Sequence, residues 1–209
     1  MGISITLGLI IVIVVASLAA WQKPEYYYKL MLNPYRVQRD KEYYRLVSSG
    51  FIHNGYGHLF FNMFTLYFFG SLMEALLYRE IGSTGSYYLI LLFLVGVIVS
   101  DIPTYLKHRN NPNYNSLGAS GGVSAVVFAS IMFNPLSPIY LMFIPLPIPG
   151  FIMGALYLIY SYYQSKQGRD NINHDAHFYG ALFGVIFSIA IKPSVAISFF
   201  QQLATWSAF

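Results

Sequence analysis

The apolar residues of this chain are gathered into long runs, and these runs limit the environment in which it can fold. Of its 209 residues, 56% are hydrophobic and only 10% are charged, whereas a soluble domain typically carries about 25% charged residues. The sequence therefore predicts an integral, multi-pass membrane protein. One crossing of the bilayer takes about 20 residues, so we expect a single membrane domain of several spans over residues 1–209.

Hydropathy predicts an all-α protein with six transmembrane helices. The fourth and fifth runs are short for about 30 Å of hydrocarbon. A short span that begins inside the protein needs an entering loop that is buried or that lines a water-filled cavity. The predicted spans are Ile3–Trp21, Gly57–Leu77, Ser86–Ile102, Ser120–Phe133, Gly150–Tyr163 and Ala176–Ile191.

The first run has an alternative interpretation as a cleaved signal peptide, because Ser17-Leu18-Ala19 resembles a cleavage site. It has no basic residues ahead of it and is long for the hydrophobic region of a signal peptide. We expect it to be retained as the first helix.

The connections between the runs differ in chemistry. The longest, Gln22 to Tyr56, is rich in tyrosine beside lysine and arginine, which is typical of the membrane interface. Pro103 to Leu117 is polar. Pro135 to Pro149 holds five prolines among apolar residues, which excludes regular helix and predicts an extended or re-entrant stretch. The apolar tail, Pro193 to Phe209, is expected to lie along the interface.

Charge and cysteine content exclude several functions. The net charge is +4 without a basic tract, so nothing indicates a nucleic-acid partner. The chain has no cysteine, which excludes disulfides, thiolate nucleophiles and cysteine-ligated metals. Ten of the twelve Lys and Arg residues lie in the first, third and fifth connections. The positive-inside rule would place these connections in the cytoplasm.

Polar residues within the apolar runs converge at one end of three predicted helices. The second, fourth and sixth spans run in the same direction, because two crossings separate each from the next. Ser120 opens the fourth span, His177 lies in the first turn of the sixth, and His58 and Asn62 lie in the first turns of the second. Polar groups in lipid are costly to keep, so their convergence predicts a functional site.

Ser120 and His177 have the chemistry of a nucleophile and its general base. The oxyanion of acyl transfer needs preorganised donors, which the backbone N–H of Ser120 and the side chains of His58 and Asn62 can supply. Each residue alone is more often a packing or structural residue, and their joint occurrence favours catalysis. His53 lies about 140° from His58 around a helix, so we expect it to precede the helix and brace the loop.

Small residues predict that the fourth and sixth helices pack together closely, as small residues allow between membrane helices. This contact would turn the histidine towards the serine instead of towards lipid. The face on the sixth helix comprises His177, Gly180 and Gly184, and the stripe on the fourth comprises Gly121, Ala125 and Ala129.

Other reaction chemistries fit less well. The three histidines at 53, 58 and 177 lack the closely spaced ligands of catalytic zinc sites. An aspartyl mechanism needs two acids within helices, and Asp101 and Asp175 are expected at span ends. Asp175 is two residues from His177 and should point elsewhere on the helix, so we predict a dyad. No metal or other cofactor is expected.

These motifs together resemble the rhomboid family of intramembrane serine proteases. The resemblance implies a six-helix core, Ser120 as nucleophile, His177 as base, and His58 with Asn62 at the oxyanion. It also implies cleavage of single-span membrane proteins near the end of their span, without metal or ATP. The motifs are Gly118-Ala119-Ser120-Gly121, His53…His58-x-x-x-Asn62, Ala176-His177-x-x-Gly180-x-x-x-Gly184, Tyr44-Arg45 (with Tyr replacing the family's Trp), Gly70-x-x-x-Glu74 and the proline-rich stretch.

Two features depart from the family pattern. Many bacterial relatives carry an aromatic residue four positions after the serine, where it stacks on the base, and Ser124 stands at that position here. The family's six-helix form has its amino terminus in the cytoplasm, which is opposite to the orientation that the basic residues favour. No mitochondrial-type presequence is visible, so we expect a bacterial plasma (inner) membrane.

Two alternative functions remain open from the sequence. The first is a catalytically inactive rhomboid-like protein that binds transmembrane clients, which loss of the serine or histidine would indicate; both are present. The second is a small polytopic transporter whose Ser, Asn and His line a solute path. A transporter of this kind should show paired broken helices in two related halves, and none is evident in the sequence.

Overall fold

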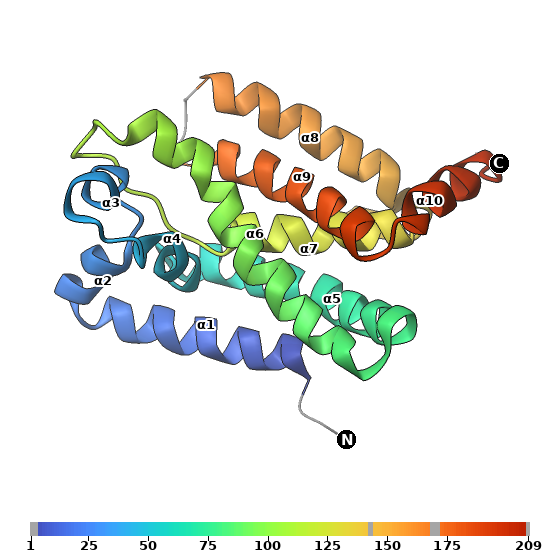
Figure 1. Cartoon of the computed structure of the whole chain (residues 1–209), viewed down its shortest axis with the longest axis horizontal. Coiled ribbons are helices and arrows are strands. Elements are labelled where there is room, and N and C mark those ends of the chain that lie inside the picture. The colour runs from blue at the N-terminus through green and yellow to red at the C-terminus, as the bar shows by residue number, and fades with distance from the viewer. Residues whose placement is uncertain (1–3, 142–143, 168–171, 208–209) are drawn as a thin grey trace.

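The computed structural model describes residues 4–141, 144–167 and 172–207, which are mostly helical (Figure 1). Six of the helices, between 14 and 26 residues long, match the predicted spans. Ile3, where the first span was predicted to begin, lies outside the described residues. The six are α1 (Ile5–Trp21), α5 (Tyr56–Ile81), α6 (Gly85–His108), α7 (Ser120–Phe133), α8 (Gly150–Gln167) and α9 (His174–Ile191).

Successive members of this set run in alternating directions (Figure 1). Helices α5, α7 and α9 begin at one end of the molecule, and α1, α6 and α8 begin at the other. Helix α7 packs against α5, α6 and α9, and nearly all of its residues are buried. The parallel arrangement predicted for the second, fourth and sixth spans is therefore confirmed, with α7 at the centre.

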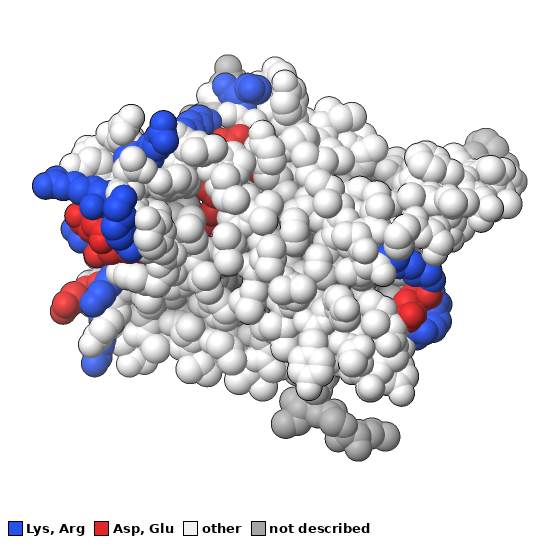
Figure 2. Space-filling view, viewed as in Figure 1, with Lys and Arg blue, Asp and Glu red and all other residues white. Residues whose placement is uncertain are grey.

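Two described segments are long and apolar enough to cross a membrane by length and composition, Tyr56–His108 (α5 and α6 together) and His174–Ile191. Helices α1 and α7 are shorter apolar helices of 17 and 14 residues. On the face shown in Figure 2, charged side chains gather near the α2–α3 end and near the turn between α5 and α6. A broad uncharged belt separates these two groups.

Helix α6 is longer than the third predicted span. That span was expected to end at Ile102, but the helix continues through Pro103 to His108. A proline removes one backbone hydrogen bond from a helix. In the turn that follows, Thr104 is buried and its hydroxyl donates to Asn173 Oδ1 at 3.0 Å. Asp101, which was expected at a span end, is therefore inside α6, and its side chain is buried.

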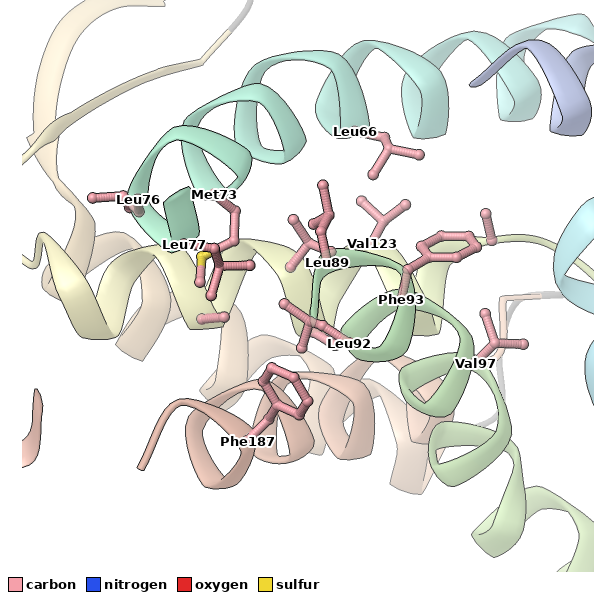
Figure 3. Close-up of a cluster of buried hydrophobic side chains, with 14 of the residues drawn as sticks. Leu66, Met73, Leu76, Leu77, Leu89, Leu92, Phe93, Val97, Val123 and Phe187 are labelled. Carbon is pink, nitrogen blue, oxygen red and sulfur yellow. The ribbon is translucent and has the colours of Figure 1, made fainter. Parts of the chain in front are cut away.

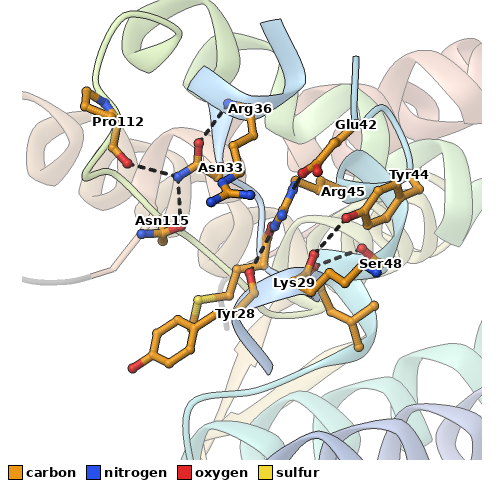
Figure 4. Close-up of polar contacts among 12 residues, drawn as sticks. Tyr28, Lys29, Asn33, Arg36, Glu42, Tyr44, Arg45, Ser48, Pro112 and Asn115 are labelled. Atoms are coloured by element: carbon orange, nitrogen blue, oxygen red, sulfur yellow. Dashed lines mark hydrogen bonds and ion pairs between the residues drawn. The ribbon is translucent and has the colours of Figure 1, made fainter. Parts of the chain in front are cut away.

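The first connection folds into short helices held around one buried arginine. Arg45 Nη1 donates to the carbonyl oxygens of Tyr28 (3.0 Å) and Met31 (2.7 Å), and its Nε pairs with Glu42 (Figure 4). The short elements are α2 (Pro24–Leu30), α3 (Pro34–Asp40), α4 (Arg45–Ser48) and η1 (Ser49–Phe51).

The proline-rich stretch forms an antiparallel hairpin of β1 (Pro138–Leu141) and β2 (Ile144–Pro149), in which Pro138 faces Pro149. The extended conformation predicted there is confirmed. The expectation of an all-α fold is corrected by this hairpin, since prolines cannot continue a helix but are tolerated on edge strands. The tail contains α10 (Ser194–Ala204), which packs against α7 and α9.

The hydrophobic core lies where α5, α6, α7 and α9 meet. Figure 3 shows side chains from these four helices in one cluster. Leu66 of α5 and Leu89, Leu92 and Phe93 of α6 are fully buried there. This core fixes the relative positions of the three helices whose first turns carry the predicted site.

Helix α1 is attached to α5 by the Gly70-x-x-x-Glu74 motif. The Glu74 carboxylate accepts hydrogen bonds from the backbone N–H groups of Ile5 (2.9 Å) and Thr6 (3.1 Å) and from Ser4 Oγ (2.7 Å). A Cβ at Gly70 would lie 2.7 Å from Thr6 Cγ2. The motif therefore allows close approach and caps the beginning of α1 with a negative charge, where the helix dipole favours one.

Candidate active site

Helices α7 and α9 contact each other through their backbones. A Cβ added at Gly180 would lie 2.2 Å from the carbonyl oxygen of Gly121, and one added at Gly184 would lie 2.2 Å from that of Ala125. Real Cβ atoms do not approach so closely, so glycine is required at both positions. The predicted small-residue interface is confirmed, and it brings the first turn of α7 beside the first turn of α9.

The four predicted site residues line one cavity of about 830 Å³. Ser120 comes from α7, His177 from α9, and His58 with Asn62 from α5. Side chains of α5 and α8 also line this cavity, and its lining is mostly apolar. The structure thus brings together all four residues, at the end of the molecule where their helices begin.

The loop that precedes Ser120 is braced by His53. The Ala119 N–H donates to His53 Nε2 at 3.3 Å, so this nitrogen carries no proton. His53 Nδ1 consequently holds the ring proton and donates to Ser17 Oγ of α1 at 3.0 Å. Burial, together with the smaller effect of His58, lowers the pKa of His53 to about 3. The prediction that His53 precedes the helix and braces the loop is confirmed.

Gly118 fixes the other side of this loop. Its N–H donates to the carbonyl oxygen of Ser49 at 2.9 Å, and its φ of 123° is unfavourable for any residue with a Cβ. A Cβ there would also lie 2.6 Å from Cε1 of His58. Ser49 Oγ in turn donates to the buried carboxylate of Asp101 at 3.3 Å, a contact that sequence reasoning missed because it placed Asp101 at a span end.

His58 and Asn62 are held against the cavity wall by local hydrogen bonds. His58 Nδ1 lies 2.9 Å from Asn54 Oδ1, and an amide oxygen can only accept, so Nδ1 carries the ring proton. A neutral His58 then has no proton on Nε2. Asn62 Nδ2 donates to the backbone carbonyl of His58 at 3.0 Å and retains a second N–H. This pairing favours Asn62 over His58 as a side-chain donor to an oxyanion.

Asp175 is directed to a partner outside the site. Its carboxylate pairs with Lys107 Nζ at 3.1 Å. The expectation that Asp175 does not complete a triad with His177 agrees with this pairing.

Helix α8 contributes an aromatic ring that sequence reasoning missed. The ring of Tyr157 stacks on that of His177 with centroids 6.1 Å apart and an interplanar angle of 18°. The Tyr157 hydroxyl lies 2.8 Å from Ser124 Oγ on α7. Tyr157 is one of four tyrosines in α8, and no local pattern distinguishes it from the others.

The fold and the site define a mostly helical protein in which a serine and a histidine line one cavity. The family model described as the Rhomboid domain matches residues 40–194, which include every candidate site residue. The chain belongs to the rhomboid family. This family of membrane proteins includes intramembrane serine proteases and inactive relatives.

A curated relative, "RHOMBOID-like protein 12, mitochondrial" from Arabidopsis thaliana, is 26% identical over 177 residues. The matched region covers 76% of this chain and 50% of the relative, so the chain spans about half the length of that protein. The name of this relative assigns it to mitochondria, and the comparison gives no support to a bacterial plasma membrane. That compartment stays a prediction from the sequence.

Proposed function

We propose that this chain is an intramembrane serine endopeptidase that cleaves single-span membrane proteins, with Ser120 as nucleophile and His177 as general base. One observation carries the proposal: the two residues line the same cavity, at the ends of two helices that touch through Gly180 and Gly121. Backbone contact between α7 and α9 leaves little freedom for the first turns to separate. A serine and a base held in this way are the two parts of an activated nucleophile.

The proposal includes six membrane crossings within one domain, made by α1, α5, α6, α7, α8 and α9. The uncharged belt between two charged ends supports this arrangement (Figure 2). At 1.5 Å per residue, the 14 residues of α7 extend over about 21 Å, which is less than the hydrocarbon thickness of about 30 Å. At least one end of α7 therefore lies below a membrane surface, and we propose that it is the end that carries Ser120. The loop residues that also line the cavity, Asn115 and Ser116 among them, would give water a route to it.

In the proposed reaction, His177 accepts the proton of Ser120 Oγ as this oxygen attacks the carbonyl carbon of the scissile peptide bond. The C–N bond of the tetrahedral intermediate then breaks, and His177 gives its proton to the departing amine. Water, activated by the same histidine, hydrolyses the acyl-enzyme and regenerates Ser120. No metal or other cofactor takes part in these steps.

The negative oxygen of the intermediate needs donors that are already in place. The backbone N–H of Ser120 lies at the first position of α7, where helical N–H groups have no acceptor within the helix. The second amide proton of Asn62 is the side-chain donor that we propose. His58 would contribute directly only as an imidazolium, because its Nδ1 donates to Asn54 in the neutral form.

A substrate helix would reach Ser120 sideways from the bilayer, through the side of the cavity bordered by α5 and α8. Phe61 and Phe69 of α5 and Met153 of α8 give these walls an apolar surface suited to a membrane-spanning segment. The substrate must unwind locally, because the carbonyls of a hydrogen-bonded helix are shielded from attack. Unwinding is easier near the end of a span, so we propose cleavage there.

Labelling with a fluorophosphonate probe tests the proposal, because only an activated serine reacts with it. We expect the wild-type protein in detergent to be labelled, and the Ser120→Ala and His177→Ala variants to lose both labelling and cleavage of a model single-span substrate. Ser130→Ala is the matched control, since Ser130 lies on the same helix and its hydroxyl donates to the backbone carbonyl of Val127.

A folded wild-type protein that binds a transmembrane client without labelling or cleavage would instead establish the inactive, client-binding alternative. Membership in the rhomboid family favours the protease or an inactive relative over the transporter. Equal cleavage by wild-type protein and the Ser120→Ala variant would refute the assigned nucleophile.

A further inference from the structure

The stacked pair of Tyr157 and His177 joins two helices, α8 and α9, at the site. The rings lie nearly parallel, with an interplanar angle of 18°, and their centroids are 6.1 Å apart. Tyr157 also contacts the ring of Phe128 on α7, with centroids 5.7 Å apart. The side chain is therefore fixed between α7 and α9 although it belongs to α8.

Ser124 holds the Tyr157 ring in this position. Ser124 is buried, and a hydroxyl in apolar surroundings is costly unless it has a hydrogen-bond partner. Its partner is the Tyr157 hydroxyl at 2.8 Å. Ser124 lies one helical turn after Ser120, so the tyrosine is anchored to the same face of α7 that carries the nucleophile. A ring at position 124 itself would occupy much of the space that Tyr157 fills.

We infer that Tyr157 is a positioning residue for the His177 base, and that α8 delivers it to the site through the hydrogen bond with Ser124. This assignment rests on the proposed protease function. A flat ring against one face of the imidazole restricts its rotation, which is otherwise broad for a histidine. The same face attracts the imidazolium that forms during proton transfer.

The position of α8 thereby determines whether the base is correctly oriented. Helix α8 forms one wall of the cavity, and it contacts both α7 and α9. When α8 lies against α7, Tyr157 is hydrogen-bonded to Ser124 and stacked on His177. Displacement of α8 outwards would remove the ring and leave the imidazole unsupported on that side. The chemistry would then require α8 to be packed against α7.

Kinetics of purified variants in detergent test this inference. Tyr157→Leu should lower kcat for a single-span substrate by about 5- to 10-fold, the effect of losing one aromatic pair, with KM unchanged. Tyr157→Phe keeps the ring but loses the hydroxyl, and Ser124→Ala loses the other half of the same hydrogen bond. We expect these two to have equal and smaller effects, and the double variant to be no slower than either, because they remove one interaction.

Rescue separates positioning of the base from a general packing role. Ser124→Tyr combined with Tyr157→Leu moves the ring from α8 to α7, and we expect it to restore most of kcat. The matched control is Tyr163→Leu, which removes an exposed tyrosine of the same helix and should leave kcat and KM unchanged. Fluorophosphonate labelling rates should follow kcat through the whole series.

The inference would be overturned if Tyr157→Leu kept the wild-type kcat or only raised KM. It would also be overturned if the Ser124→Tyr, Tyr157→Leu double variant had wild-type thermal stability but did not recover activity. Absence of labelling in the wild-type protein would overturn the proposed function itself, and this inference with it. The two failures are therefore distinguishable.

Discussion

The α-carbon of Gly184 lies so close to the carbonyl oxygen of Ala125 that a Cβ at this position would stand 2.2 Å from the oxygen. The same relationship occurs one turn nearer the site, where a Cβ at Gly180 would lie 2.2 Å from the carbonyl oxygen of Gly121. Backbone carbonyls cannot rotate away as a flexible side chain can. The spacing between α7 and α9 therefore depends on the absence of a Cβ atom at Gly180 and Gly184, and so does the approach of the His177 imidazole to Ser120.

Gly180→Ala and Gly184→Ala should each destabilise the protein by at least 1–3 kcal/mol, roughly the cost of overpacking an interior, and should lower proteolysis. Thermal unfolding in detergent with a parallel cleavage assay measures both effects. Gly8→Ala is the control, because a Cβ on this residue of α1 would meet no atom within 4 Å. Unchanged stability in both α9 variants would show that the two helices do not touch as described.

Stability should fall in acid because of His53. The pKa of this residue is lowered by burial from 6.5 to about 3, so below pH 6.5 the unfolded chain binds a proton that the folded protein excludes. Above pH 6.5, neutral His53 makes its full contribution to the free energy of unfolding. As the pH falls from 6.5 towards 3, that free energy decreases by about 1.4 kcal/mol per pH unit.

The His53→Gln variant isolates this effect, since the remaining histidines titrate in both proteins. The free energy of unfolding should be greater for wild type at pH 7.5, and the difference should shrink by about 2 kcal/mol on going to pH 5. Denaturant unfolding in detergent at several pH values provides the comparison. Parallel pH dependences in the two proteins would mean that His53 is not held neutral by the fold.

Asn62→Ala should reduce kcat by about 100-fold with little change in KM, as expected when one oxyanion donor is removed and a backbone donor remains. His58→Ala should have a smaller effect on kcat near neutral pH, because its Nδ1 donates to Asn54. Tyr78→Ala, at an exposed position near the far end of the same helix and outside the cavity lining, is the control. An unchanged kcat for Asn62→Ala would assign this residue a structural role.

Glu74→Ala should destabilise α1 by about 2 kcal/mol, a typical cost for losing charge-assisted hydrogen bonds at a helix start. The substitution removes the acceptor for Ser4, Ile5 and Thr6. Glu25→Ala, on the exposed surface of α2, should be neutral. The susceptibility of α1 to an added protease in detergent and the thermal unfolding temperature distinguish the Glu74→Ala and Glu25→Ala variants. If both properties were the same in the two variants, Glu74 would not cap α1.

The elements whose signals are local were predictable from the sequence. Helix α7 begins and ends where its span was predicted, at Ser120 and Phe133, because Gly118 precedes it and prolines follow it. The helix-pairing face around Gly180 was predictable for a similar reason, since small residues at helical spacing allow the backbones of membrane helices to approach. Because the second, fourth and sixth spans run in the same direction, the sequence alone also predicted that the site residues lie at one end of these helices.

Features that depend on tertiary packing were not predictable. Pro103 alone predicts the end of a helix, yet α6 continues to His108, and Thr104 in the next turn is buried and donates to Asn173, which is distant in sequence. Tyr157 could not be distinguished from its neighbours, because its role depends on the hydroxyl of Ser124 and the ring of His177, both distant in sequence. The hydrogen bond between His58 and Asn54 likewise could not be predicted from residue spacing. It places the ring proton of neutral His58 on Nδ1, so this residue is a poorer oxyanion donor than the sequence suggested.

Helix α1 has polar attachments at both ends, to Glu74 where it begins and to His53 through Ser17 near where it finishes. It therefore connects, at a fixed distance, the last third of α5 with His53, which braces the loop before Ser120. Its register is consequently set twice. One residue inserted between Thr6 and Ser17 would turn the far attachment by about 100° and advance it by about 1.5 Å, so the helix could satisfy either anchor but not both.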